Sequence, residues 1–256
     1  MTDTPNIPLS ADERIDRVNE NICLIQKKNG LTFGTDAYML AAFIRTSTRA
    51  RAVDLGSGTG IISLLCAAKG KLGHIYAAEI QQEFAELGDR NIKLNGLEEK
   101  ITQIHSDIRD LGPEVFGGEV DAVFSNPPYM KSGCGRECAA DIKHIARHEE
   151  NGGIDDFCAA AARILRYGGL FYTVWRPDRL IDLVDSLRRH RLEPKRMTFV
   201  YSDTSSKPAI VLTEAKLGGS PSLDLTAPLI LYKNSAKENP RVLTEEAKRV
   251  YDTCTL

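Results

Sequence analysis

From Arg51 onward, the chain alternates short apolar runs with longer stretches of helical periodicity, and this alternation leaves few folds open. The apolar runs cover 51–55, 74–80, 100–108, 121–126 and 170–175, and helical stretches at 61–70, 81–97 and 155–169 lie between them. Strands that alternate with helices form βαβ units, whose parallel sheet is covered by helices on both faces. We therefore predict an α/β fold with a mostly parallel sheet.

The second half of the chain adds a different pattern. Two further β-rich runs, 196–203 and 209–217, follow a helix at about 178–190. The residues that join them, "TSSKP", are too few for a helical crossover, so we expect an antiparallel hairpin at the end of the sheet. The tail predicts a short strand at 229–232 and a polar helix at 244–253.

Composition restricts the class of protein but not its partner. Of the 256 residues, 42% are hydrophobic and 27% charged, which is typical of a soluble globular chain. No apolar stretch approaches the roughly 20 residues that span a bilayer, and residues 1–20 lack the features of a signal peptide. We expect a cytoplasmic protein with no membrane partner and with its six scattered cysteines reduced.

The glycine-rich stretch "DLGSGTG" lies between the first predicted strand of this region and the following helix. Glycines at such a turn adopt backbone angles that a Cβ would forbid and let a ligand approach closely. Their spacing, Gly56, Gly58 and Gly60, differs from the G-x-G-x-x-G of dinucleotide sites. Asp54, just before the loop, disfavours a pyrophosphate and suits a cationic ligand. The spacing therefore argues against a nicotinamide oxidoreductase.

Two more carboxylates are expected at neighbouring strand ends. Glu79 ends the second strand, where an acid can bind both ribose hydroxyls, and Asp107 ends the third, where a carboxylate can accept a hydrogen bond from an adenine amino group. A ligand with a ribose, an adenine and a cationic centre fits all three acids, which indicates S-adenosylmethionine. The alternative is that the glycines form a tight turn and the acids cap helices.

The stretch "SNPPY" ends the fourth strand because proline cannot donate to a ladder. The Asn126 side-chain oxygen and the Pro127 carbonyl can accept hydrogen bonds from both N–H groups of an exocyclic amine. Pro127 and Pro128 fix the backbone corner that holds these acceptors. Tyr129 can stack on the planar group, a contact worth roughly 1–3 kcal/mol for a base. The motif is typical of amino methyltransferases that act on adenine, cytosine, guanine or glutamine nitrogen.

The sequence also resembles one family over most of residues 14–253. The stretches that carry the resemblance are "RIDRVNENICLIQKKNGLTFGTDA" (14–37), "LTFGTDAYMLAAF" (31–43), "IARHE" (145–149) and "LTEAKLGGSPSLDLTAPLILY" (212–232). They are similar to bacterial tRNA adenine N6-methyltransferases, which modify the adenine beside the anticodon of a valine tRNA. The resemblance implies a Rossmann-like class I methyltransferase, with S-adenosylhomocysteine as product and tRNA as partner.

The resemblance also assigns residues. It places Asp54, Gly56, Glu79, Asp107 and Asn126 in the cofactor pocket, and Asn126, Pro127, Pro128 and Tyr129 in the catalytic motif. We add Gly58 and Gly60 of the loop, and Thr35 and Asp36, to the cofactor-binding residues. Thr35 or Asp36 is also expected to cap the helix at 36–44, and capping alone is the alternative role of Asp36. Residues 1–50 form an N-terminal extension with that one helix, 51–235 the methyltransferase domain, and 236–256 a C-terminal helix.

Basic residues predict where RNA binds. Lys131, Arg136, Lys143 and Arg147 adjoin the expected base pocket, whereas the cluster Arg188, Arg189, Arg191, Lys195 and Arg196 is equally explained as a solvated helix face. Cys134, Cys138, His144 and His148 have zinc-ligand chemistry, but the spacing is too short for a finger and we expect no metal. Tyr172 and Trp175 are expected in the core.

Three alternatives stay open at this point. A ribosomal RNA methyltransferase and a release-factor glutamine methyltransferase are rival enzymes, and a non-catalytic RNA-binding module with the same fold is the rival outside enzymes. We expect no DNA partner, because the chain has no room for a target-recognition domain. We also expect the protein to be a monomer.

Overall fold

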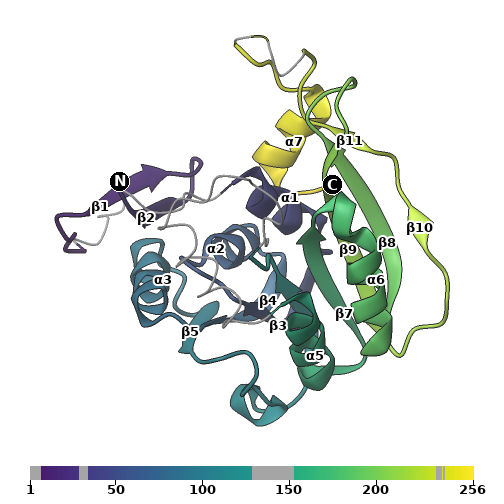
Figure 1. Cartoon of the computed structure of the whole chain (residues 1–256). Coiled ribbons are helices and arrows are strands. Elements are labelled where there is room, and N and C mark those ends of the chain that lie inside the picture. Colours follow the sequence, from purple (N-terminus) through teal and green to yellow (C-terminus); the bar gives the residue numbers. More distant parts are fainter. Residues whose placement is uncertain (1–6, 29–33, 129–152, 235–237, 239) are drawn as a thin grey trace, which may run out of the picture.

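The computed structural model describes residues 7–28, 34–128, 153–234, 238 and 240–256, and these contain one large sheet (Figure 1). Its strands are β3 (Ser47–Leu55), β4 (Leu72–Glu79), β5 (Ile101–His105), β6 (Val120–Ser125), β7 (Leu165–Trp175), β8 (Leu192–Tyr201), β9 (Pro208–Leu217), β10 (Asp224–Leu225) and β11 (Leu229–Ile230). The order is β10-β8-β9-β7-β6-β3-β4-β5, and β11 also pairs with β8.

Strand directions confirm the predicted α/β fold. The strands from β5 to β7 pair in parallel, whereas β9 pairs antiparallel with both β7 and β8. The short connection between β8 and β9 therefore closes the hairpin expected from the sequence. It places β9 between β7 and β8, so that the sheet is parallel at its centre and mixed at one end.

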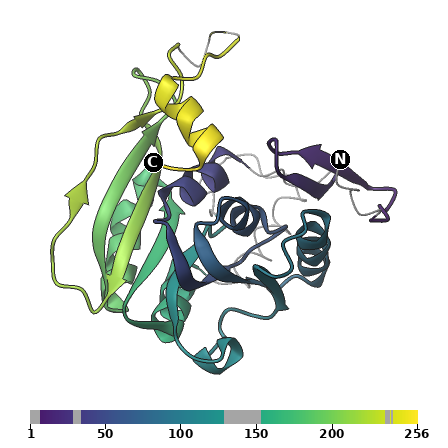
Figure 2. The same ribbon diagram turned by 180° about the vertical axis from the view of Figure 1, so that it is seen from behind.

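Helices cover both faces of the sheet (Figures 1 and 2). They are α1 (Thr35–Phe43), α2 (Ile61–Ala68), α3 (Gln82–Leu94), α5 (Ile154–Ile164), α6 (Leu180–Arg189) and α7 (Glu245–Thr253), with short 3-10 turns η1 (Pro113–Phe116) and η2 (Pro177–Arg179). One apolar cluster joins α1, α2 and α7 to the sheet, and a second joins α5 and α6 to its other face. Tyr172 and Trp175, 2% and 6% exposed, lie in these clusters as predicted. No helix among the described residues is long and apolar enough to cross a membrane.

Three boundaries differ from the sequence predictions. Helix α1 is capped by Gly34, not by Thr35 or Asp36, because Gly34 is extended and its carbonyl accepts from the Ala37 N–H at 3.2 Å. Helix α5 ends at Ile164, before the predicted end at residue 169. Gly168 and Gly169, which the sequence suggests as the end of the helix, lie inside β7. Gly169 is required there because a Cβ would approach the Asp121 carbonyl of β6 to 3.1 Å. Asp107 lies two residues beyond the end of β5 rather than on it.

The N-terminal segment contains a hairpin that the sequence analysis missed, formed by β1 (Glu13–Arg17) and β2 (Cys23–Lys27). Both strands are short, β1 is rich in charge and the apolar residues of β2 are adjacent, so neither shows the apolar alternation that predicts a strand. The hairpin lies beside α3, at the end of the molecule away from β8 (Figures 1 and 2). Ile25 packs there in a small apolar cluster with Leu87 and Leu94 of α3.

Candidate methyl-transfer site

The candidate site lies where the strand order reverses. The chain proceeds from β3 to β4 on one side, and later from β6 to β7 on the other, so the carboxyl ends of β3 and β6 flank a crevice of the kind that binds ligands in open α/β sheets. Asp54 pairs with Phe124 across these strands. The buried Ser125 hydroxyl donates to the Leu55 carbonyl at 2.7 Å. The glycine loop and the "NPP" corner therefore leave the sheet side by side.

The glycine loop has the backbone that its composition predicts. Gly56, Gly58 and Gly60 have φ values of +70°, +55° and +85°, a region that L side chains rarely adopt. The Gly56 and Ser57 N–H groups both donate to the Ala78 carbonyl of β4 at 2.9 Å. At Gly56 a Cβ would also lie 3.3 Å from the Phe157 ring of α5, so the loop is held against both β4 and α5.

Asp54 is buried with half of its carboxylate unpaired. It is 1% exposed, and its Oδ2 accepts from the Ser63 hydroxyl at 2.7 Å. Its Oδ1 has no hydrogen-bond partner within the described part of the chain. Burial raises the pKa of Asp54 from 3.8 to about 7, against the opposing hydrogen bond from Ser63, and the nearby Glu79 carboxylate raises it further. A cationic ligand would satisfy Oδ1 and favour the ionised form.

Glu79 and Asp107 already accept hydrogen bonds, but their carboxylates can accept more. The Glu79 carboxylate, 5% exposed, accepts from the N–H groups of Gly58 and Gln81 at 2.9 Å, one on each oxygen. A carboxylate offers about four acceptor positions, so a ribose hydroxyl can still donate to it. The Asp107 carboxylate accepts from the Arg109 side chain at 3.0 Å, which holds the pKa of Asp107 below its ordinary value. An adenine amino group would share Asp107 with Arg109.

The structure describes only part of the corner that the sequence predicts to be catalytic. Asn126 follows β6 directly and is half-buried, Pro127 is buried and Pro128 is half-buried. The remaining predicted residues of this region, Tyr129, Lys131, Arg136, Lys143, Arg147 and the cysteines and histidines at 134, 138, 144 and 148, lie outside the described residues. Among the described residues, no group of His, Cys, Asp and Glu side chains is arranged to hold a metal ion.

Thr35 and Asp36 form the first turn of α1 and are half-buried. The Thr35 side chain forms a hydrogen bond with Tyr251 of α7, which lowers the pKa of that phenol while burial raises it more strongly. The structure therefore ties this turn to the C-terminal helix. The cofactor role of Thr35 and Asp36 stays a prediction.

Sequence reasoning missed four residues that position this site. Ser63 holds Asp54, Ser125 holds the end of β3, Phe157 packs against Gly56, and Asn91 of α3 donates to the Thr59 carbonyl of the glycine loop at 3.0 Å. Ser63 carried a usable signal, since it falls on the first turn of the helix after the loop. The others come from distant parts of the chain and have no local signature.

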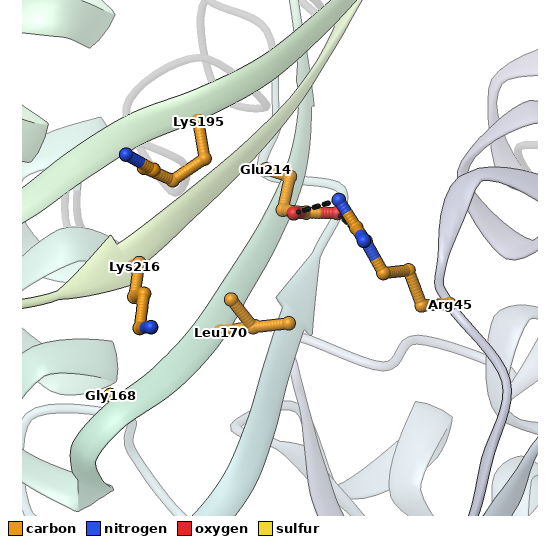
Figure 3. Close-up of a pocket in the computed structure, with 6 residues that line it drawn as sticks. All are labelled: Arg45, Gly168, Leu170, Lys195, Glu214 and Lys216. Atoms are coloured by element: carbon orange, nitrogen blue, oxygen red, sulfur yellow. Dashed lines mark hydrogen bonds and ion pairs between the residues drawn. The ribbon is translucent and has the colours of Figure 1, made fainter. Parts of the chain in front are cut away.

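The basic cluster around residues 188–196 is largely neutralised. Arg188 pairs with Glu193, Arg189 with Asp155 and Asp185, and Arg196 with the buried Glu214. Glu214 also binds Arg45 through two hydrogen bonds of 2.7 and 2.8 Å, at a pocket of about 360 Å³ (Figure 3). Its lining is Arg45, Gly168, Leu170, Lys195, Glu214 and Lys216. Leu170 pairs with Ala122 near the start of β6, so the pocket lies towards the opposite end of the strands from Asn126.

Comparison with known proteins agrees with this geometry. The sequence model of the methyltransferase small domain family matches residues 28–189, which include the glycine loop, the acids and the "NPP" corner. The chain belongs to the methyltransferase small domain family. The match begins at Lys28 and includes α1.

Two curated relatives of this chain have the same name. A protein of Phocaeicola vulgatus is 28% identical over 183 residues, 72% of this chain and 76% of the relative. A protein of Porphyromonas gingivalis is 29% identical over 187 residues, 71% of this chain and 72% of the relative. Both are named tRNA1(Val) (adenine(37)-N6)-methyltransferase.

Solved structures agree with the fold. A predicted O-methyltransferase from Agrobacterium tumefaciens has a TM-score of 0.67 at 21% identity, covering 86% of this chain and 97% of its own. The TYW2 protein of M. jannaschii, solved in complex with AdoMet, has a TM-score of 0.56 at 16% identity, covering 82% and 88%. The predicted class I methyltransferase fold is thereby confirmed.

Proposed function

We propose that this methyltransferase small domain protein transfers a methyl group from S-adenosylmethionine to the exocyclic N6 of an adenine in tRNA, and that the target is adenine 37 beside the anticodon of tRNA(Val). The observation that carries the chemistry is the contiguity of the glycine loop after β3 and the "NPP" corner after β6. The relatives' names support the choice of substrate.

The chemistry of the residues around the glycine loop fits S-adenosylmethionine. The buried, unpaired Asp54 Oδ1 suits a cationic group, Glu79 has acceptor positions left for ribose hydroxyls, and Asp107 can accept from the adenine amino group. Gly56 and Gly58 belong to the proposed cofactor set, and at Gly58 a Cβ would meet nothing within 4 Å, so the loop is open there. When bound, S-adenosylmethionine supplies the methyl group as an activated electrophile. Thr35, Asp36 and Gly60 complete the proposed cofactor set.

The protein's contribution to the chemistry is orientation of the amine. An exocyclic amine is a poor nucleophile because its lone pair is delocalised into the base. The Asn126 side-chain oxygen and the Pro127 carbonyl accept hydrogen bonds from the two N–H groups of the amine and favour tetrahedral geometry at its nitrogen. Since Pro127 is buried and Pro128 has a fixed φ, these acceptors are preorganised and need no rearrangement during reaction.

Contacts with RNA complete the proposal. Tyr129 stacks on the splayed adenine, and Lys131, Arg136, Lys143 and Arg147 bind phosphates, since all lie in the segment between the catalytic corner and α5. We propose that the protein acts as a monomer, without a DNA partner.

The deciding experiment uses radiolabelled S-adenosylmethionine and total tRNA from a strain that lacks this protein, followed by nucleoside analysis. We expect label in N6-methyladenosine, and the same product with valine tRNA alone. Absence of labelled tRNA from a protein that binds S-adenosylhomocysteine would reject the substrate. The same assay would then be run with ribosomal RNA and with release factor, the two rival substrates.

A further inference from the structure

Asn91 of α3 and Asn95, which directly follows that helix, bind the outer edge of β2 in the N-terminal hairpin. The Asn91 side chain accepts from the Ile25 N–H at 2.6 Å and donates to the Ile25 carbonyl at 3.2 Å. Asn95 does the same to Cys23, at 2.9 and 2.8 Å. Four helical residues advance about 6 Å and two strand residues about 6.8 Å, so the two side chains match the strand's repeat. The two side chains thus make the backbone hydrogen bonds that a neighbouring strand would make at this edge of β2.

Asn91 makes one contact that Asn95 does not. Its Nδ2 also donates to the Thr59 carbonyl of the glycine loop at 3.0 Å, whereas Asn95 uses its second donor on the Asn91 carbonyl at 2.7 Å. The N–H of the same Thr59–Gly60 peptide donates to the Ser57 carbonyl at 2.9 Å. This peptide, which directly precedes α2, is thus fixed at both of its polar ends.

We infer that Asn91 is a positioning residue of the cofactor site, and that it couples docking of the β1–β2 hairpin to the conformation of the glycine loop. The side chain is fully buried, and its two amide hydrogens and its oxygen are all used by Ile25 and Thr59. Ile25 fixes the plane of the amide, and that plane determines where the second hydrogen points. The hairpin is therefore a structural component of the cofactor site, although it contains none of the predicted cofactor residues.

Other contacts keep the hairpin in place, so the coupling can be tested without undocking it. Ile25, Leu87 and Leu94 form an apolar cluster, and ion pairs of 2.8 Å join Glu13 to Arg90 and Lys27 to Glu83. A variant of either asparagine should fold. Since Asn91 and Asn95 make equivalent bonds to β2, each is the control for the other.

The first test measures the affinity for S-adenosylhomocysteine by titration calorimetry in Asn91→Ala and Asn95→Ala, with the melting temperature of each. We expect the melting temperature to fall by a similar amount in both variants. Asn91→Ala should bind S-adenosylhomocysteine about tenfold more weakly than wild type, the order of effect of one lost buried hydrogen bond, and Asn95→Ala within about threefold. Equal affinities in the two variants would overturn the inference, because Asn91 would then serve the fold alone.

The second test uses hydrogen exchange of the amides in residues 13–27. Coupling is reciprocal, so a ligand that is helped by the docked hairpin must stabilise the docking by the same factor. S-adenosylhomocysteine should slow exchange of the hairpin in wild type and in Asn95→Ala, but not in Asn91→Ala. Unchanged exchange in ligand-saturated wild type would refute the coupling.

The inference rests on the proposed function, and the two fail differently. A wild-type protein that does not bind S-adenosylhomocysteine refutes the proposed cofactor and the inference together. A wild-type protein that binds it, with identical affinity and hairpin exchange in both variants, refutes the role of Asn91 alone.

Discussion

Replacing Asp54 by asparagine should be more favourable for the stability of the ligand-free protein at pH 8 than at pH 5, and should weaken its binding of S-adenosylhomocysteine. The folded-state pKa of Asp54, about 7, lies above the ordinary value of 3.8. Between these values the folded chain therefore binds more protons than the unfolded chain, and stability falls as pH rises. For these two values the loss between about pH 5 and pH 8 is roughly 3 kcal/mol of unfolding free energy.

Asparagine keeps an oxygen for the Ser63 hydroxyl but does not titrate, so its own cost is the same at both pH values. The melting temperature of Asp54→Asn relative to wild type should therefore be higher at pH 8 than at pH 5 by roughly 6–12 °C. Calorimetric scans of both proteins at the two pH values measure this difference directly. Asp89→Asn, which changes an exposed carboxylate on α3, controls for the loss of one negative charge.

The same substitution tests the role of the carboxylate in binding. S-adenosylhomocysteine lacks the sulfonium of S-adenosylmethionine, but its α-ammonium group is cationic and favours the ionised form of Asp54. Wild-type affinity for S-adenosylhomocysteine should therefore fall as pH drops below about 7. Asp54→Asn should bind at least about tenfold more weakly at pH 8, with little pH dependence. A melting-temperature difference that is the same at pH 5 and pH 8 would refute the raised pKa and the reasoning built on it.

Three further predictions concern the corner, the loop and the distant pocket. Asn126→Ala should lower turnover at least about a hundredfold in steady-state assays and change S-adenosylhomocysteine affinity less than about tenfold, because one preorganised acceptor is lost; wild-type turnover would reject Asn126 as the amine acceptor. Gly56→Ala and Gly96→Ala both place alanine at positive φ, +70° and +62°, and each should lose about 1–2 kcal/mol of stability in urea titrations. Only Gly56→Ala should also lose ligand binding, so equal ligand affinities would contradict the loop assignment. Glu214→Leu leaves the partly buried Arg196 without its carboxylate and should cost about 3 kcal/mol in the same titrations, with unchanged activity per folded molecule; a selective loss of activity would connect the Figure 3 pocket to the site.

The sequence predicted the part of the site that depends on local chemistry. The strands were recognised because fully buried parallel strands read as continuous apolar runs, and the glycine loop because only glycine tolerates three positive φ values in five residues. The acids and the "NPP" corner were recognised because they lie at or just beyond strand ends, whose carboxyl edges meet in a parallel sheet. The same local reasoning failed at Gly34, where a backbone cap leaves no side-chain signal, and at Gly168 and Gly169, where a sheet irregularity resembles a helix stop.

Contacts between distant segments could not be predicted in this way. Asn91 meets Ile25 across 66 positions because the β1–β2 hairpin packs on α3, and Ser125 meets Leu55 across 70 because β3 and β6 are neighbours in the sheet. The raised pKa of Asp54 likewise depends on burial, to which α2 and the neighbouring strands contribute.

By itself, then, the sequence determined the fold class and the glycine loop, and it supplied the residues proposed for methyl transfer, because periodicity and backbone geometry are properties of neighbouring residues. The tertiary structure decided how those residues are charged and held. Strand order sets which loops meet, burial sets the protonation of Asp54, and the docked hairpin supplies Asn91 with the partner that orients its amide. These are effects of desolvation and of long-range packing, and no short stretch of the chain encodes them alone.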